Sequence, residues 1–430
     1  MARHRSNGNR LHRLTLILLS AVVFITASAT PSDTSEGVFD PRFRTVKTSV
    51  EGAFMLPPVI RLGTEDRISI NFDEIGEDNS YLEYRLIHCD ADWQPSRLVE
   101  SEYLDGFNSA RIEDFAYSAS TFVHYVNYQI FIPNEDMRVI HSGNYLLQVY
   151  DPDSPDETLL QTRFQVVEGS VGIAGAATSR TDRGHYSQWQ QLAFELDCEG
   201  LRNVNPYQDL IVEVTQNQRE ATRRQIKSPL RVSGNIVTYE HLPDLIFPAG
   251  NEYRRFESIS NLFPGMHVDS LRFMGTNYHV WLKPDEARAE RGYNFDRTQN
   301  GRFIVREYNA SDSDIGADYI TVHFTLDAPE LIDADIYVDG EFTHNSYTAA
   351  NRMTYDRDAH LYRAEIPLKQ GNYNYQYVAL KRGDRPDSAT PAPIEGNKYE
   401  TDNEYSVAVY YRPPGARADR LVGFTTLHPL

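Results

Sequence analysis

The densest cluster of reactive side chains in the sequence is the segment His88-Cys89-Asp90-Ala91-Asp92-Trp93. Imidazole, thiol and carboxylate groups at this spacing suit a metal site, or a histidine that activates a cysteine nucleophile. Neighbouring residues of a strand point to opposite faces, however, so His88 and Cys89 diverge if the strand that begins at Tyr81 continues through Cys89. A buried cysteine behaves as a small apolar side chain, and aspartates often form turns. The pattern therefore favours a structural turn.

Two acidic loops, at residues 151–157 and 312–318, raise the question of calcium binding. Their carboxylates are Asp151, Asp153, Asp156 and Glu157 in the first loop and Asp312, Asp314 and Asp318 in the second. Calcium takes about six to eight oxygen ligands, and an EF-hand supplies a bidentate glutamate at its twelfth position. Counted from Asp312, that position is His323. Solvated turns are the favoured interpretation, and calcium at either loop stays an open alternative.

A tyrosine stripe at Tyr373, Tyr375 and Tyr377 alternates with Asn372, Asn374 and Gln376. This stripe would suit an aromatic platform for a sugar or a protein partner. Tyrosine also suits the half-buried face of an ordinary strand, and the polar residues between the tyrosines favour that interpretation.

Sequence motifs for catalysis are missing. The sequence contains no G-x-S-x-G, H-E-x-x-H or G-x-x-x-x-G-K-[ST] pattern, and its two cysteines do not have the spacing of a zinc site. We therefore predict a protein that is not an enzyme, with no catalytic, cofactor-binding or metal-binding residues and no cofactor. The sequence does not indicate which residues contact a partner, and no small-molecule substrate is expected.

The composition excludes further classes of protein. The chain has 430 residues and a formal net charge of −19, which argues against nucleic-acid binding and against anionic membrane surfaces. Two cysteines do not make a disulfide framework. We predict that Cys89 and Cys198 lie in different domains and remain free thiols.

The first residues of the chain predict export. Four arginines precede the apolar stretch 14–27, and Ala27-Ser28-Ala29 provides small residues for cleavage before Thr30. We predict a signal peptide at residues 1–29. The apolar stretch is short for a membrane span, and no later stretch is long enough to be one.

Strand patterns separated by turns dominate the rest of the chain, and they predict an all-β fold. Clear examples are residues 125–132, 145–150, 159–167, 189–196, 209–215, 319–326, 334–338, 361–366 and 405–411. We predict tandem immunoglobulin-like or early-set β-sandwich domains at residues 30–168, 169–310 and 311–430. The boundaries follow the small-residue run 169–178 and the polar stretch 308–313.

Ten long sequence runs resemble the type IX secretion system plug protein family, a Bacteroidota family long carried as a domain of unknown function. The runs are LIHCDADWQPS (86–96), EYLDGFN (102–108), FIPNEDM (131–137), SGNYLLQVY (142–150), QNQR (216–219), FPAGNEYRRF (247–256), ADYITVHFTL (317–326), LKQGNYNYQY (368–377), EGNKYETDNEYSVAVYYR (395–412) and DRLVG (419–423). The resemblance covers about residues 45–423.

The resemblance implies a function that the composition does not. The expected protein is a non-enzymatic periplasmic component at the inner face of the outer membrane, with the type IX translocon barrel as its partner. It would close the periplasmic end of that barrel when no cargo occupies it. Within residues 311–430, the runs IYVDGEF (336–342), MTYD (353–356) and LKQGNYNYQYV (368–378) also resemble early-set sandwiches that bind glucans. Residues 343–347 lack the tryptophan that those modules use. A carbohydrate-binding or cell-surface module is therefore the alternative.

Overall fold

The computed structural model describes residues 34–202 and 204–430, and Thr34 to Leu430 form one compact unit. The predicted signal peptide, residues 1–29, and its cleavage site lie outside the described residues. Strands dominate the described chain, and its α-helices are one-turn segments: α1 (Glu100–Tyr103), α2 (Ser313–Gly316) and α3 (Ala392–Glu395). Four 3₁₀ turns complete it: η1 (Glu220–Thr222), η2 (Pro243–Leu245), η3 (Glu341–Thr343) and η4 (Pro386–Ser388). The predicted all-β fold is confirmed.

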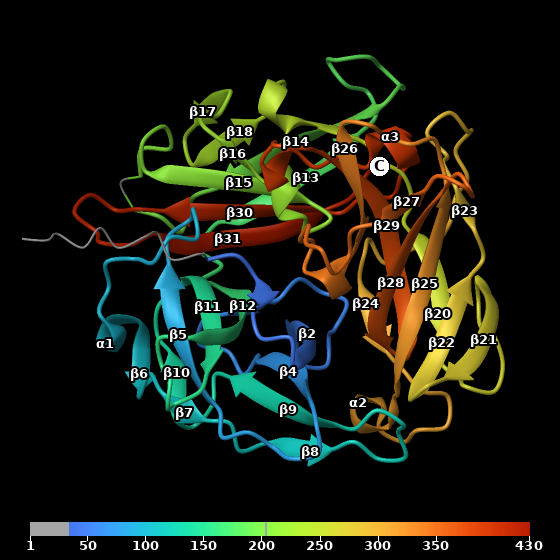
Figure 1. Cartoon of the computed structure of the whole chain (residues 1–430). Coiled ribbons are helices and arrows are strands. Elements are labelled where there is room, and N and C mark those ends of the chain that lie inside the picture. The colour runs from blue at the N-terminus through green and yellow to red at the C-terminus, as the bar shows by residue number, and fades with distance from the viewer. Residues whose placement is uncertain (1–33, 203) are drawn as a thin grey trace, which may run out of the picture. The chain divides into compact units, whose positions relative to one another are not determined.

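The first sandwich packs two sheets around one apolar core (Figure 1). One sheet contains β1 (Gly37–Val38), β12 (Thr158–Val167), β11 (Gly143–Tyr150), β5 (Glu83–Cys89) and β7 (Ala110–Arg111), with β3 (Val59–Arg61) parallel to β12. The other contains β2 (Phe43–Val50), β4 (Ile68–Ile75), β9 (Tyr125–Ile132) and β8 (Phe115–Tyr117). A short ribbon of β6 (Leu104–Gly106) and β10 (Met137–Val139) lies beside them. Apolar residues of both sheets alternate with polar ones and face each other, as a sandwich requires.

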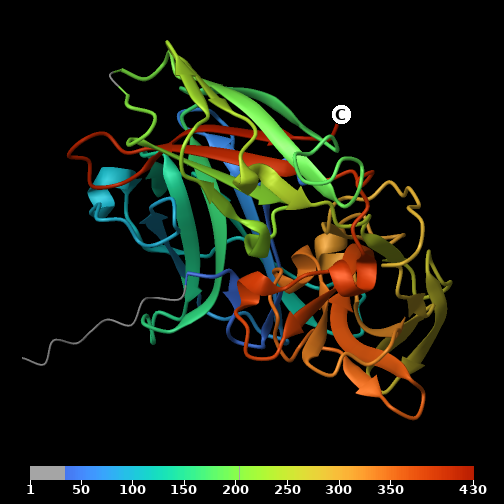
Figure 2. The same ribbon diagram turned by 90° about the horizontal axis from the view of Figure 1, so that it is seen from above.

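The second sandwich combines strands from the middle and the end of the chain. One sheet contains β13 (Gly172–Thr178), β14 (Trp189–Asp197), β18 (Ile236–Tyr239), β17 (Arg231–Ser233) and β19 (Ile246–Pro248). The other contains β16 (Arg224–Ile226), β15 (Leu210–Gln216), β30 (Tyr405–Tyr411) and β31 (Arg420–Leu427). Figure 2 shows the red C-terminal strands beside the green strands of this sandwich.

The third sandwich is built from the residues between those two parts. One sheet contains β20 (Arg254–Ser258), β29 (Gly371–Lys381), β24 (Phe303–Val305) and β26 (Ala334–Asp339). The other contains β21 (Val268–Met274), β22 (Asn277–Leu282), β25 (Tyr319–Asp327), β28 (Leu361–Lys369), β27 (Thr354–Asp356) and β23 (Asp285–Glu286).

The sheets do not follow the predicted boundary between residues 310 and 311. Strands β20 to β24 precede it yet pair within the third sandwich, whereas β30 and β31 follow it yet complete the second. The polar stretch that suggested this boundary is a loop inside the third sandwich, where Asp312 caps α2 by accepting from the Asp314 amide at 2.9 Å. Whether residues 30–168, 169–310 and 311–430 are domains that fold independently stays a prediction.

Candidate functional site

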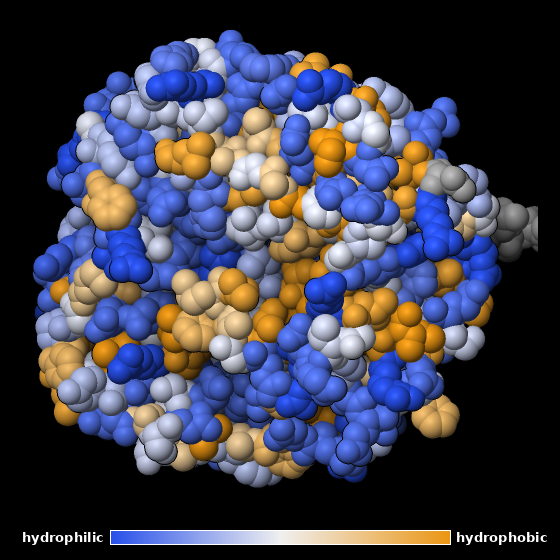
Figure 3. Space-filling model, turned by 180° about the vertical axis from the view of Figure 1, so that it is seen from behind, coloured by the Kyte–Doolittle hydropathy of each residue, from blue (hydrophilic) through white to orange (hydrophobic). Residues whose placement is uncertain are grey.

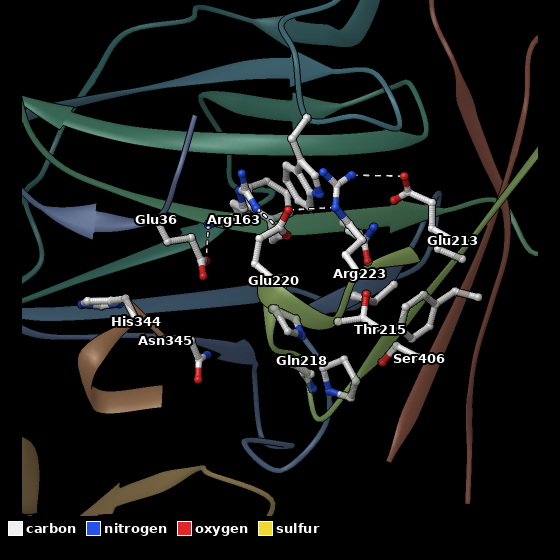
Figure 4. A pocket seen from close by; sticks show the side chains of 18 of the residues that line it. Glu36, Arg163, Glu213, Thr215, Gln218, Glu220, Arg223, His344, Asn345 and Ser406 are labelled. Atoms are coloured by element: carbon white, nitrogen blue, oxygen red, sulfur yellow. Dashed lines mark hydrogen bonds and ion pairs between the residues drawn. The ribbon is translucent and has the colours of Figure 1, made fainter. Parts of the chain in front are cut away.

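A crevice lies where the three sandwiches meet. Residues of β12, β15, β30 and the loop after η3 line a cavity of about 140 Å³, and a neighbouring cavity of about 80 Å³ shares part of that lining. Figure 4 shows charged and amide side chains from these elements pointing toward the space between them. Pockets at such junctions are frequent sites of ligand binding, so the chemistry of this lining decides what the crevice can do.

Arg163 and Glu36 form one wall of the crevice, on the first sandwich. The Arg163 guanidinium packs 4.4 Å from the Trp93 ring and donates to Glu220 at 3.2 Å, which joins the first sandwich to the second. The Glu36 carboxylate accepts the Arg163 backbone amide at 2.9 Å. These contacts bind the start of the described chain to β12.

Glu213 and Arg223 form the opposite wall, on the second sandwich. Arg223 donates to Glu213 at 3.1 Å and to Glu220 at 2.8 Å. Burial raises the pKa of the Glu213 carboxyl to about 7, although the nearby Arg223 guanidinium opposes this shift. Perturbed carboxyl groups of this kind occur at catalytic sites and also in structural ion-pair networks.

The crevice does not contain an assembled catalytic group. Its serine, Ser406, has a buried Oγ atom with no hydrogen-bond partner among the described residues. A serine nucleophile needs a base within hydrogen-bond reach to take its proton. The Arg163–Glu220 ion pair crosses from the first sandwich to the second, while Arg223 pairs with Glu213 and Glu220 within the second, so the lining of the crevice joins the two sandwiches.

A buried ion pair fastens the third sandwich to the first. Lys369 and Asp73 have side-chain exposures of 1% and 0%, and Lys369 Nζ donates to Asp73 Oδ2 at 2.7 Å. The Tyr319 hydroxyl donates to the same carboxylate oxygen at 2.7 Å, and Asn127 donates to the other at 2.8 Å. The ammonium also lies 4.0 Å from the centre of the Tyr125 ring. Every polar atom of the carboxylate therefore has a partner, which a buried charge requires.

Two further buried ion pairs fasten the second sandwich to the third. Arg219 donates to Asp339 at 3.2 Å, and both side chains are almost fully buried. Arg302 donates to Glu404 at 2.6 Å, with side-chain exposures near one tenth. Separating the two members of a buried ion pair would leave each charge buried without compensation. These contacts therefore fix how the two sandwiches pack.

The segment around His88 and Cys89 belongs to the joint between the first and second sandwiches. The two side chains diverge as predicted: the His88 ring packs against Tyr145, whereas Cys89 packs in a separate cluster with Trp93. Asp90 accepts the Asp419 amide at 2.9 Å and pairs with an arginine of the second sandwich. The segment is a structural turn, and sequence reasoning missed that it reaches a residue 329 positions away.

Both thiols are free and buried in the structure, in accordance with the prediction that Cys89 and Cys198 do not form a disulfide. Cys198 lies in the core of the second sandwich, whereas Cys89 lies at the end of β5 in a small cluster apart from the main core of the first. Burial raises the pKa of the Cys89 thiol to about 12 and that of the Cys198 thiol to about 11, which removes the reactive thiolate at neutral pH.

The acidic loops use their carboxylates for local structure. Asp151 accepts the Asp153 amide at 2.9 Å. Both Asp318 oxygens accept backbone amides of residues 122 and 123 at 3.0 Å, so this aspartate joins the third sandwich to the first. No group of three or more histidine, cysteine or acidic side chains in the described part of the chain is arranged to hold a metal ion.

The tyrosine stripe on β29 is a structural strand face, which is the interpretation that the sequence favoured, although it is fully buried and not half-buried. Tyr373, Tyr375 and Tyr377 have exposures of at most 1%, and the last two donate to Asp285 at 2.7 Å. Asn374 and Gln376 on the other face are buried too, because β29 lies within its sheet and is covered on both faces. The stripe therefore offers no surface on which a sugar ring stacks.

No signal in the sequence marks the joint residues. Asp73, Lys369, Arg219 and Asp339 each lie in or beside a strand pattern in which a polar residue is expected to face water. Only the packing of one sandwich on another buries them.

Comparison with known proteins identifies the family. The model of the Type 9 secretion system plug protein 1st domain matches residues 43–168. A crystal structure of a hypothetical protein from Parabacteroides merdae is 39% identical, with a TM-score of 0.89 over 92% of this chain and 99% of that one. The chain belongs to the type IX secretion system plug protein family. The matched first domain coincides with the first sandwich, and the Parabacteroides structure shares all three sandwiches across nearly its whole length.

Other solved structures are much less similar to this plug-family chain. The alkylpurine DNA glycosylase AlkC of Pseudomonas fluorescens is 14% identical over 29% of this chain and 30% of its own, with a TM-score of 0.18. The collagen adhesin of Staphylococcus aureus is 9% identical over 92% of this chain and 94% of its own, with a TM-score of 0.11. Scores this low carry no argument about fold or function. No curated protein matches the chain.

No helix among the described residues is long and apolar enough to cross a membrane.

Proposed function

We propose that this chain is a non-enzymatic periplasmic component of the type IX secretion system. It binds the outer-membrane translocon barrel and closes its periplasmic end while no cargo occupies the pore. Membership of the plug protein family is the observation that carries this proposal. An N-terminal segment with the pattern of a signal peptide supports delivery to the periplasm.

The construction of the fold agrees with this task. A protein that closes a pore must be rigid. Buried ion pairs join the third sandwich to both of the others and so fix the three sandwiches to one another. The crevice holds ion-paired side chains where an enzyme would hold a substrate. The tyrosines of β29 are buried, so they give the carbohydrate-binding alternative no platform on which a sugar ring could stack.

Co-purification tests this function. A tagged chain, expressed in its own host, is isolated from detergent-solubilised outer membranes, and the translocon barrel is detected in the eluate. We expect the barrel to elute with the tagged chain and to be missing from an untagged strain. Recovery of the chain without the barrel, from membranes in which the barrel is present, contradicts the proposal.

A further inference from the structure

Apolar side chains gather at one end of the third sandwich, and much of their surface is exposed. This apolar end consists of Phe122, Leu262, Phe263, Met266, Phe273, Met274 and Tyr308, whose exposures range from 44% to 83%. Six of these residues belong to loops and strand ends of the third sandwich, and Phe122 belongs to a loop of the first.

The sheet register brings these segments to the same end. Ser258, where β20 ends, pairs with Gly371, where β29 begins. In the facing sheet, Tyr319, where β25 begins, pairs with Lys369, and the neighbouring Ile320 lies opposite Tyr278. The 259–266 loop and the tip of the β21–β22 hairpin therefore leave the sandwich on the side of α2, as can be followed in Figure 1.

Direct contacts hold the aromatic part of the apolar end together. The Phe122 ring lies 4.9 Å from the Phe273 ring and 5.6 Å from the Tyr278 ring, and Phe273 and Tyr278 are 5.2 Å apart. Phe263 packs edge to face on Tyr308 at 5.8 Å. The surface is thus organised by packing, although water still covers about half of each outer side chain.

A chain of hydrogen bonds connects the two aromatic groups. Asn261, in the loop that carries Leu262 and Phe263, accepts from Gln370 at 3.2 Å. Gln370 accepts the Asp318 amide at 2.9 Å, and the Asp318 carboxylate accepts the Phe122 amide at 3.0 Å. The loops are therefore anchored to each other through buried polar side chains.

The area and composition of the apolar end match those of a protein interface. A large aromatic or aliphatic side chain presents about 200 Å², so the exposed fractions of these residues give roughly 800 Å². This total is close to the area that one partner contributes to a standard interface, about 800 Å². Aromatic residues and methionine are also enriched at the centres of interfaces, where charge is depleted.

Charge restricts which occupant fits. Residues 259–266 and 273–278 contain no charged side chain, although the whole chain carries −19. A second copy would bring together two strongly negative molecules, and an anionic lipid surface would repel the chain. An uncharged apolar surface on a different protein meets neither obstacle. Figure 3 shows a face that is largely hydrophilic and on which apolar side chains gather in several groups.

We propose that the apolar end of the third sandwich is the surface through which this chain docks on the type IX translocon, against an uncharged apolar surface of that machinery. This inference rests on the proposed function and adds the face and the chemistry of the contact. The first sandwich contributes to the docking surface through Phe122, so the buried contacts between the first and third sandwiches position it.

Charge insertion tests the docking surface. Leu262 and Met274 are exposed, and the double substitution Leu262→Glu/Met274→Glu places two carboxylates on the apolar end without opening the core. Ile332→Glu is the matched control, because Ile332 is 81% exposed in the loop before β26, at the opposite end of the same sandwich. Each variant is compared with wild type by thermal unfolding and by co-purification with the translocon barrel.

We expect the double variant to unfold like wild type and to lose at least tenfold in recovery of the barrel, while Ile332→Glu retains it. If wild type itself fails to recover the barrel, the proposed function fails. Equal recovery by wild type and the double variant overturns the docking surface alone. Two further results also overturn the docking surface. One is that wild type self-associates in sedimentation velocity and the double variant does not. The other is that wild type binds vesicles containing phosphatidylglycerol and the double variant does not.

Discussion

Replacing Lys369 by methionine tests whether the buried ion pair with Asp73 fixes the third sandwich on the first. The substitution keeps the length of the side chain and removes its charge. Asp73 is then left fully buried with hydrogen bonds from Tyr319 and Asn127 but without its counter-ion. Removing one partner of a buried pair costs about 3–5 kcal/mol, because the remaining charge has lost its compensation.

The reciprocal variant and the double variant sharpen this test. Asp73→Asn leaves the Lys369 ammonium buried without a counter-ion, since its remaining acceptors, such as the Asp314 carbonyl, are neutral. We expect a loss of similar size. In Asp73→Asn/Lys369→Met neither charge remains, so the double variant should lose less stability than either single variant. Such strong coupling is typical of residues in direct contact.

Urea unfolding followed by tryptophan fluorescence measures these changes, since urea is uncharged and does not screen the ion pair. Arg357→Met, which breaks an exposed pair with Glu330, is the control and should leave the free energy of unfolding unchanged. Additive losses in the double variant, or losses below about 1 kcal/mol in both single variants, would refute the reasoning.

Three other predictions concern the crevice and the cores. Burial raises the folded-state pKa of Glu213 to about 7, above its unfolded value, so the folded state holds the proton and stability falls as pH rises toward 7. In urea titrations, the free energy of unfolding of Glu213→Gln should increase relative to that of wild type by about 1.4 kcal/mol per pH unit between about pH 5 and 7. A difference between the two proteins that does not change with pH contradicts this. Cys89 and Cys198 should both resist 5,5′-dithiobis(2-nitrobenzoic acid) at pH 8 in the native protein and both react in urea without reductant; a disulfide would leave them unreactive. A Cβ atom at Gly143 would lie 2.3 Å from His88 Nε2, whereas one at Gly234 would meet nothing within 4 Å, so Gly143→Ala should cost about 1–3 kcal/mol more than Gly234→Ala in the same assay.

Local sequence patterns predicted the strands well, because alternation and turn residues act over a few positions. The strands predicted at residues 125–132 and 405–411 are β9 and β30 with the same bounds. Pairing between strands that are far apart along the chain was not predicted, because no local pattern records it. β15 pairs with β30 although almost two hundred residues separate them, since the whole third sandwich lies between.

The joint residues and the docking surface have no local pattern. In the sequence, Asp73 and Lys369 look like ordinary polar residues of strands. They are buried only because two sandwiches pack together over them. Phe122, Leu262 and Phe273 come from three separate segments, and an exposed apolar residue in a loop has the same sequence context as a buried one. By contrast, resemblance in long motifs identified the family directly, because it does not depend on which face each residue occupies.

Envelope permeability tests whether the chain closes the translocon. Entry of an antibiotic too large for ordinary porins is measured in the wild type, in a strain lacking this chain, and in a strain lacking both this chain and the translocon barrel. We expect increased entry when the chain alone is deleted, a return to wild-type entry when the barrel is also deleted, and recovery on complementation. Unchanged entry in the single deletion, with the barrel present and free of cargo, would show that the chain does not close the translocon.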